Sequence, residues 1–320
     1  MAAFILFLLL SCSLAFIMAA WPAIIPLVVI LWGAVLITAG LYLKRTQLLV
    51  LFLANIAVLF SVGGLTAVFV MTIGGLAIMV MSYVAWRGGY YYQLQKAGIA
   101  IAVVGLSLFL GLMYFQIHDT WERDLQSGIN EYIDQTMQSY EQSGLAKIYA
   151  DQGITKEEVI QKAREFSRTT VRHMWAICYL QVIMTVFFAL LLASFINRKS
   201  PDERLKKKPY SQEIMAWQLV WLVIAGLALC VWGNKQGNGL FYVGSNILVV
   251  LLPITVYYGL AAVIYKIRQM RDTTQRWFII ALVVLSTIFL PSALIFFSIF
   301  GMFDALLDYR KLRIKKGDLA

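Results

Sequence analysis

Long runs without a charged residue constrain this chain more than any other feature of its sequence. Between Thr46 and Trp86, about forty consecutive residues include no Asp, Glu, Lys or Arg. A transmembrane helix needs about 20 consecutive apolar residues, so this run alone is long enough for two. The stretch Ser61-Val-Gly-Gly64 near its middle predicts a turn. We therefore expect two short helices here, joined at that turn.

Further apolar runs predict a polytopic membrane protein. Hydrophobic residues make up 61% of the 320 residues and charged residues 14%, whereas soluble proteins average about 45–50% and about 25%. A soluble protein of this length could not cover so much apolar surface in one core. We predict an all-α transmembrane helix bundle of about eight or nine spans, surrounded by the lipid bilayer. The runs cover residues 2–20, 23–43, 46–86, 97–117, 174–196, 214–232, 240–265 and 277–303.

The first two runs predict a helical hairpin, which ends at the basic residues Lys44 and Arg45. A cleaved signal peptide is the alternative for residues 2–20, because Ala19 and Ala20 resemble a small-residue cleavage site. The run lacks the positively charged segment with which signal peptides begin, and this favours the hairpin.

The segment from 118 to 172 differs in kind, because it holds ten acidic and seven basic residues. Its apolar residues recur at helical spacing, and Thr155-Lys-Glu-Glu158 forms a capping box that predicts a helix start. We predict a small helical insert outside the bilayer. The chain then divides into residues 1–117 with about five spans, the insert 118–172, and the C-terminal spans 173–320.

Basic residues in the loops predict the orientation in the membrane. The loop 197–208 holds six bases and two acids, which places it in the cytoplasm by the positive-inside rule. Counting spans from this loop puts the N-terminus in the cytoplasm and the insert on the extracytoplasmic side. We therefore expect a multi-pass protein of the bacterial inner (cytoplasmic) membrane.

The run 277–303 leaves the side of the basic C-terminal tail open. A single span would place the tail outside, against the rule. A break at Pro291, forming a re-entrant hairpin, would place it inside, which we prefer.

Motifs of catalysis are missing from the sequence. No Asp, Glu, Lys or Arg lies deep in a predicted span, and Walker A, HExxH and GxSxG sequences do not occur. Cys12, Cys178 and Cys230 lie in apolar runs without metal-ligand spacing. The net charge of +10 lies in loops between spans, where lipid headgroups explain it. We predict no enzyme, no catalytic residue, no metal or cofactor, and no nucleic-acid partner.

Uncharged polar residues within the spans are the candidates for solute binding, namely Asn55, Gln181 and Asn246. Tyr257 and Tyr258 join them, because Asn246, Pro253 and Tyr257 fall roughly on one helix face. The alternatives are hydrogen bonds between helices for the amides and interfacial anchoring for the tyrosines.

A stripe of small residues, Ser11, Ala15 and Ala19, lies along the first predicted helix. Such stripes allow close helix packing, either within the protein or against a partner subunit.

The C-terminal part carries a resemblance to a known family. The span 246–265, Leu290-Pro291 and the close Gly301-Met-Phe-Asp304-Ala-Leu-Leu-Asp-Tyr-Arg310 resemble the bacterial membrane-protein family typified by YybS. The resemblance is best over residues 205–313. One departure is Tyr258-Gly259, where that family has Gln-Gly.

This family is a distant relative of the S components of energy-coupling-factor vitamin transporters. The resemblance implies a solute-binding subunit that works with a coupling transmembrane subunit and ATPases, and the missing Walker sequence agrees with that role. The alternative is a membrane scaffold or regulatory protein that binds envelope or cytoplasmic partners. For Gly301, Asp304 and Arg310, a plain helix end and a docking element for a cytoplasmic partner both stay open.

Overall fold

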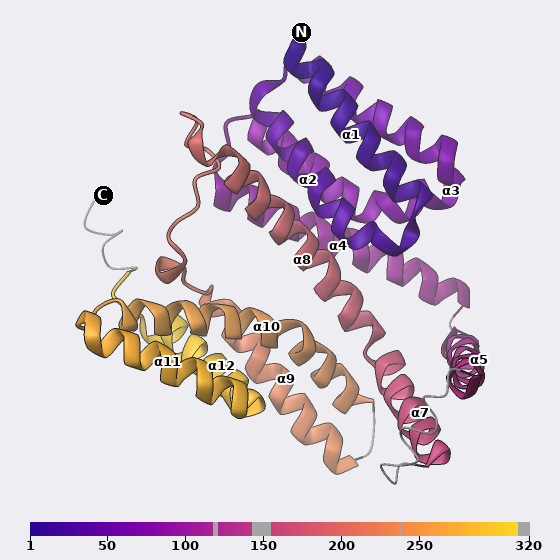
Figure 1. Ribbon diagram of the computed structural model, residues 1–320, viewed down its shortest axis with the longest axis vertical. Helices are drawn as coiled ribbons and strands as arrows, with labels where there is room; N and C mark the ends of the chain where they lie inside the picture. The colour runs from indigo at the N-terminus through magenta and orange to yellow at the C-terminus, as the bar shows by residue number, and fades with distance from the viewer. Residues whose placement is uncertain (118–120, 143–154, 237–238, 313–320) are drawn as a thin grey trace. The chain divides into compact units, whose positions relative to one another are not determined.

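A computed structural model describes residues 1–117, 121–142, 155–236 and 239–312. Within these residues every regular element is a helix (Figure 1). The chain forms two compact units. Unit 1 comprises residues 1–115 and 179–207, and unit 2 comprises residues 116–178 and 208–320. The predicted all-α class is confirmed.

Most of the described helices have the length and composition that membrane crossing requires. Seven are long and apolar enough for it, and two further apolar segments, Gly74–Trp86 and Trp217–Gly233, are shorter. Together they agree with the eight or nine predicted spans. The seven are Ala2–Ala20, Ile25–Tyr42, Arg45–Gly64, Tyr91–Met113, Met174–Lys199, Leu240–Ile267 and Leu290–Leu307.

Unit 1 begins with the predicted hairpin. Helix α1 (Ala2–Ala20) and helix α2 (Ile25–Tyr42) are joined by a single 3₁₀ turn and pack side by side. Helix α3 (Arg45–Trp86) packs against both, and α4 (Tyr91–Ile117) and most of α8 (Met174–Ile196) complete the unit (Figure 1).

Helix α3 is not one straight rod. Its 42 residues would extend about 63 Å if straight. Yet Arg204 donates hydrogen bonds both to the carbonyl of Leu41, just before α3, and to the carbonyl of Ala85 at its end. The chain therefore turns back within α3. Gly64 is the only residue of α3 with a non-helical backbone, and its φ of 64° is a conformation that favours glycine. The predicted turn at Ser61–Gly64 is confirmed.

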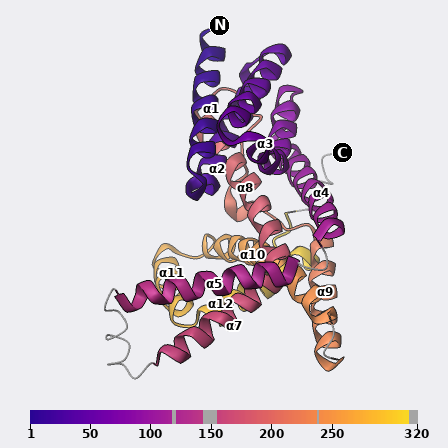
Figure 2. The same ribbon diagram turned by 90° about the vertical axis from the view of Figure 1, so that its right-hand side faces the viewer.

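The insert belongs to unit 2 and contains two described helices, α5 (Trp121–Gln142) and α7 (Lys156–Arg172), which lie side by side (Figure 2). Gln126 bonds to Ser167 at 3.1 Å between them. Thr155 caps α7: its hydroxyl accepts from the Glu158 amide at 3.2 Å, and the Glu158 carboxylate accepts from the Thr155 amide. The predicted capping box is therefore confirmed. The parts of the insert at 118–120 and 143–154 lie outside the described residues.

The remainder of unit 2 is formed by α9 (Trp217–Gln236), α10 (Leu240–Ile267), α11 (Asp272–Ile288) and α12 (Leu290–Leu307) (Figure 1). The run 277–303 is not one helix, because the chain breaks at Phe289. Pro291 then lies in the first turn of α12, where no helical hydrogen bond is lost.

Helix α12 runs in the same direction as α10. Ser298 lies opposite Thr255, and Arg310, beyond the end of α12, lies 5.7 Å from the ring centre of Tyr265 near the end of α10. Because α11 leads the chain back between them, residues 308–312 emerge at the same end of the unit as the loop 268–271. The rest of the tail, 313–320, lies outside the described residues.

Candidate functional site

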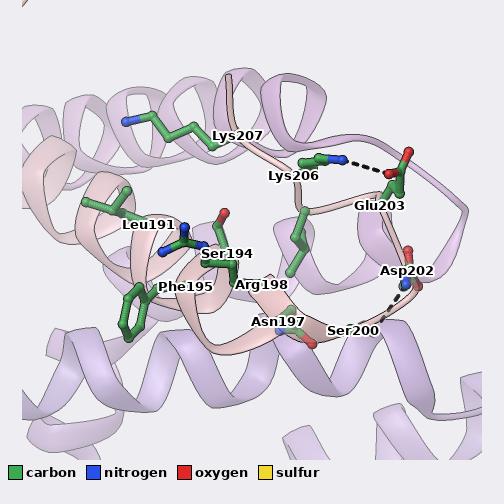
Figure 3. A pocket seen from close by; sticks show the side chains of 11 residues that line it. Leu191, Ser194, Phe195, Asn197, Arg198, Ser200, Asp202, Glu203, Lys206 and Lys207 are labelled. Atoms are coloured by element: carbon green, nitrogen blue, oxygen red, sulfur yellow. Dashed lines mark hydrogen bonds and ion pairs between the residues drawn. The ribbon is translucent and has the colours of Figure 1, made fainter. Parts of the chain in front are cut away.

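A cavity of about 420 Å³ lies in unit 1 at the carboxyl end of α8 (Figure 3). The end of α8 contributes apolar and small residues to its wall, and the following loop contributes charged ones. Its lining includes Leu191, Ser194, Phe195, Arg198, Lys206 and Lys207.

The acidic residues of the cavity wall are paired. Asp202 accepts from the Nε of Arg204 at 3.0 and 2.9 Å, and this guanidinium lowers the pKa of the Asp202 carboxyl. Glu203 accepts from the Lys206 ammonium at 2.8 Å. Among the described residues, none forms a hydrogen bond or ion pair with Arg198. Figure 3 shows Arg198 and Lys207 on the side of Leu191 and Phe195, away from Asp202 and Glu203.

Buried hydrogen bonds fix the loop that forms this cavity. Asn197 follows the last turn of α8, and its amide donates to the Ala193 carbonyl at 2.8 Å and to the Thr38 hydroxyl at 3.0 Å. Its oxygen accepts from the Tyr42 hydroxyl at 2.9 Å. Arg204 holds the other side of the loop through the ends of α2 and α3. The loop therefore has a defined shape, and its net charge alone gave no indication of this.

A second polar cluster lies in unit 2, around Arg310. The Arg310 Nε lies 2.9 Å from both carboxylate oxygens of Asp304, and Nη2 also contacts that carboxylate. The remaining donors bind the carbonyls of Ser211 at 2.6 Å and Glu213 at 2.7 Å. Both charged side chains are buried. Asp304 and Arg310 therefore join the end of α12 to the segment before α9.

The same segment places a carboxylate against α10. The hydroxyl of Tyr257 donates to Glu213 at 2.6 Å, and the hydroxyl of Tyr210 donates to the Tyr257 carbonyl at 2.6 Å. Burial and the Glu213 carboxylate raise the pKa of Tyr210 to about 12. Tyr258 packs on the apolar side, against the cluster of Met215, Val220 and Ala305. Sequence reasoning missed Glu213, because a single acid beside a predicted span resembles any loop residue.

The family-motif glycine Gly301 brings α10 and α12 into backbone contact. A Cβ at Gly301 would lie 2.5 Å from the Thr255 carbonyl oxygen, and one at Gly259 would overlap the Phe297 carbonyl. The Thr255 and Ser298 hydroxyls form a buried hydrogen bond of 2.7 Å beside this crossing.

In unit 1, Asn55 lies within the packing of three helices. Its oxygen accepts from the Trp32 indole at 2.8 Å, and its amide donates to Ser11 at 2.9 Å and to the Leu51 carbonyl. Ser11 and Ala15 of the small-residue stripe are fully buried here, and Ala19 packs at the edge of the same core. Gln181 is exposed on α8.

In unit 2, Asn246 donates to the carbonyls of Arg172 at 3.1 Å and Tyr242 at 2.8 Å. Its buried Oδ1 has no hydrogen-bond partner in the described part of the chain. Asn246 and Tyr257 share α10 but have separate partners, and neither lines the cavity. The predicted solute residues therefore do not gather into one site within either unit.

The seven long apolar helices of the described residues expose large apolar side chains along their length. They define a polytopic α-helical membrane protein. Residues 5–305 match the model of the family described as predicted membrane protein (DUF2232), and the chain belongs to that family. Comparisons with curated proteins and with solved structures give no match.

Proposed function

We propose that the protein is a non-enzymatic membrane subunit that binds a small anionic ligand in the cavity at the end of α8. The observation that supports this is the cavity itself, of about 420 Å³, with Arg198 and Lys207 on its apolar side. Ligand sites commonly have volumes of about 300–1,000 Å³ and combine apolar walls with a few placed polar groups. The cavity has both properties.

The orientation belongs to the same proposal. The six bases of loop 197–208 favour a cytoplasmic position for the cavity in a bacterial inner membrane. The N-terminus would then also be cytoplasmic, and α5 and α7 would be extracytoplasmic. Cysteine accessibility tests this, with Lys199→Cys and Glu157→Cys in cells labelled by a membrane-impermeant reagent. The reagent should label Glu157→Cys and should not label Lys199→Cys. The reverse pattern would refute the orientation.

A relation to YybS and to vitamin-transporter S components rests on the resemblance of residues 205–313. On this proposal a coupling membrane subunit and ATPases would act with the chain. The cavity supports ligand capture, although its residues differ from those that the sequence suggested. Transport itself would require the coupling subunit and the ATPases.

Affinity purification of the tagged full chain in mild detergent tests the ligand and the partners together. Mass spectrometry of the purified material should find an anionic small molecule, and ATPases if the chain serves a transporter. Arg198→Gln should lose the molecule, whereas Lys199→Gln, an equal charge loss beside the cavity, should keep it. Material without any bound anion, or equal loss in both variants, would contradict ligand binding.

A scaffold role is the second candidate, and the insert favours it. Tyr132 of α5 and Phe166 of α7 are 69% and 75% exposed on this helix pair. Exposed aromatic side chains are typical anchors in protein interfaces. Replacing both with Ser should abolish cross-linking to an envelope partner, and Glu157→Gln should not. Unchanged cross-linking would exclude this surface as the partner contact.

A further inference from the structure

We propose that the ligand in this cavity is a phosphate-bearing molecule with an apolar chain, held with its phosphate at Arg198 and Lys207 and its chain along Leu191 and Phe195. This is the chemistry of a membrane phospholipid. The inference rests on the proposed ligand-binding role and specifies the class of ligand.

The charges of the cavity favour an anion on one side only. Asp202 and Glu203 are engaged by Arg204 and Lys206 on the far side. Arg198 is exposed and forms no ion pair among the described residues. Lys207 is half-buried, and its ammonium lies 5.4 Å above the Phe187 ring. An anion beside these two cations would therefore meet positive charge without an unpaired carboxylate.

The donor types suit a phosphate. A guanidinium offers a planar fork to two phosphate oxygens, and a lysine ammonium adds a compact charge from another direction. The Ser194 hydroxyl lines the same cavity and can donate to a third oxygen. A phosphate group has enough acceptor oxygens for all three donors.

The apolar wall distinguishes a lipid from a soluble phosphate. The cavity lies at the carboxyl end of the candidate span Met174–Lys199. Its lining changes from Leu191 and Phe195 to Arg198 within two helical turns, and Phe195 is 68% exposed. Apolar residues followed by basic ones match the order of acyl chain and headgroup at a bilayer boundary. A soluble phosphate would gain nothing from Phe195.

The first experiment measures lipid retention by the purified full chain in neutral detergent, using native mass spectrometry. Phosphatidylglycerol and phosphatidylcholine are titrated in parallel, and phosphatidylglycerol should be retained preferentially. Arg198→Gln should weaken its affinity about fivefold, as expected for one basic side chain beside a lipid headgroup. Lys199→Gln should leave the affinity within about twofold, because neutral detergent presents no charged surface. Thermal unfolding of each variant verifies that it is folded.

The second experiment separates the two sources of phosphate. Phe195→Ala should weaken phosphatidylglycerol binding and leave the binding of glycerol 3-phosphate unchanged. If glycerol 3-phosphate binds as tightly as the lipid, and Phe195→Ala affects neither, the ligand is a soluble phosphate and the lipid assignment is wrong. If another anion is retained at Arg198 and no phosphate compound competes with it, the phosphate inference fails while the proposed function stands. If nothing binds, or if both charge variants behave alike, both fail.

Discussion

Arg310 and Asp304 form a buried ion pair in which the arginine Nε lies 2.9 Å from both carboxylate oxygens. Asp308, between them, has a φ of 42°, and this left-handed residue turns the chain at the end of α12 so that Arg310 folds back. The other guanidinium donors bind the carbonyls of Ser211 and Glu213. Every charge in this cluster therefore has a partner, which buried ions require.

Asp304→Ala should destabilise the protein strongly, because it leaves the Arg310 guanidinium buried without its counter-ion. Removing one partner of a buried pair costs about 3–5 kcal/mol. Unfolding in detergent, followed by circular dichroism, measures the loss. Asp272→Ala, at an exposed acid in the first turn of α11, is the control and should cost far less. Equal stabilities of the two variants would show that the ion pair contributes nothing.

Gly259→Ala should separate α10 from α12. The new methyl group would overlap the Phe297 carbonyl, and the shift would also stretch the Thr255–Ser298 hydrogen bond. Overpacking of this kind costs about 1–3 kcal/mol, measured by the same unfolding experiment. Gly105→Ala in α4 adds the same methyl group where no described atom beyond its own stretch of helix lies within 4 Å, so it should be tolerated. A Gly259→Ala variant as stable as Gly105→Ala would contradict the backbone contact.

Asn55→Leu should lower stability without affecting ligand binding, since it leaves the Trp32 indole N–H buried without an acceptor. An unsatisfied buried donor costs about 1–3 kcal/mol. Gln181→Leu makes the same change of side-chain class at an exposed position and should be nearly neutral. Loss of ligand with unchanged stability in Asn55→Leu would instead make this amide a solute contact.

Alkaline pH should weaken the cluster around Tyr210. Its pKa is raised to about 12 in the folded chain by burial and by Glu213, while an unfolded tyrosine titrates near pH 10. The folded state thus holds the proton more tightly, and this stabilisation is complete below pH 10 and is lost as the pH rises towards 12. Melting temperatures at pH 9 and 11 should fall less in Tyr210→Phe than in the parent chain. Equal decreases would show that Tyr210 does not couple folding to pH.

Local features of the sequence predicted most of the helices. Hydropathy over about 20 residues locates spans, and a glycine pair or a capping box marks a turn or helix start within four residues. The turn at Gly64 and the box at Thr155 were found in this way. The helix break at Phe289 was only one of two alternatives, since Pro291 permits a break but does not require it.

Contacts between distant residues could not be predicted in the same way. Arg310 and Ser211 are 99 positions apart, and Arg204 and Leu41 are 163 apart. Only the folded chain brings them together, so Glu213 and the cavity at α8 had no local signature. For Asn55, the sequence signal was an amide within an apolar helix. That signal is the same whether its partner is a neighbouring helix or a bound solute.

The position of Arg310 beside Ser211 also closes the path of the last four helices. The chain enters this helical group at residues 211–213 and leaves it at 310, and hydrogen bonds join these two points. The four helices between these two points therefore lead the chain back to the place from which it started. Residues 211 to 310 thus form a closed excursion of the chain, fastened where it begins and ends by one guanidinium.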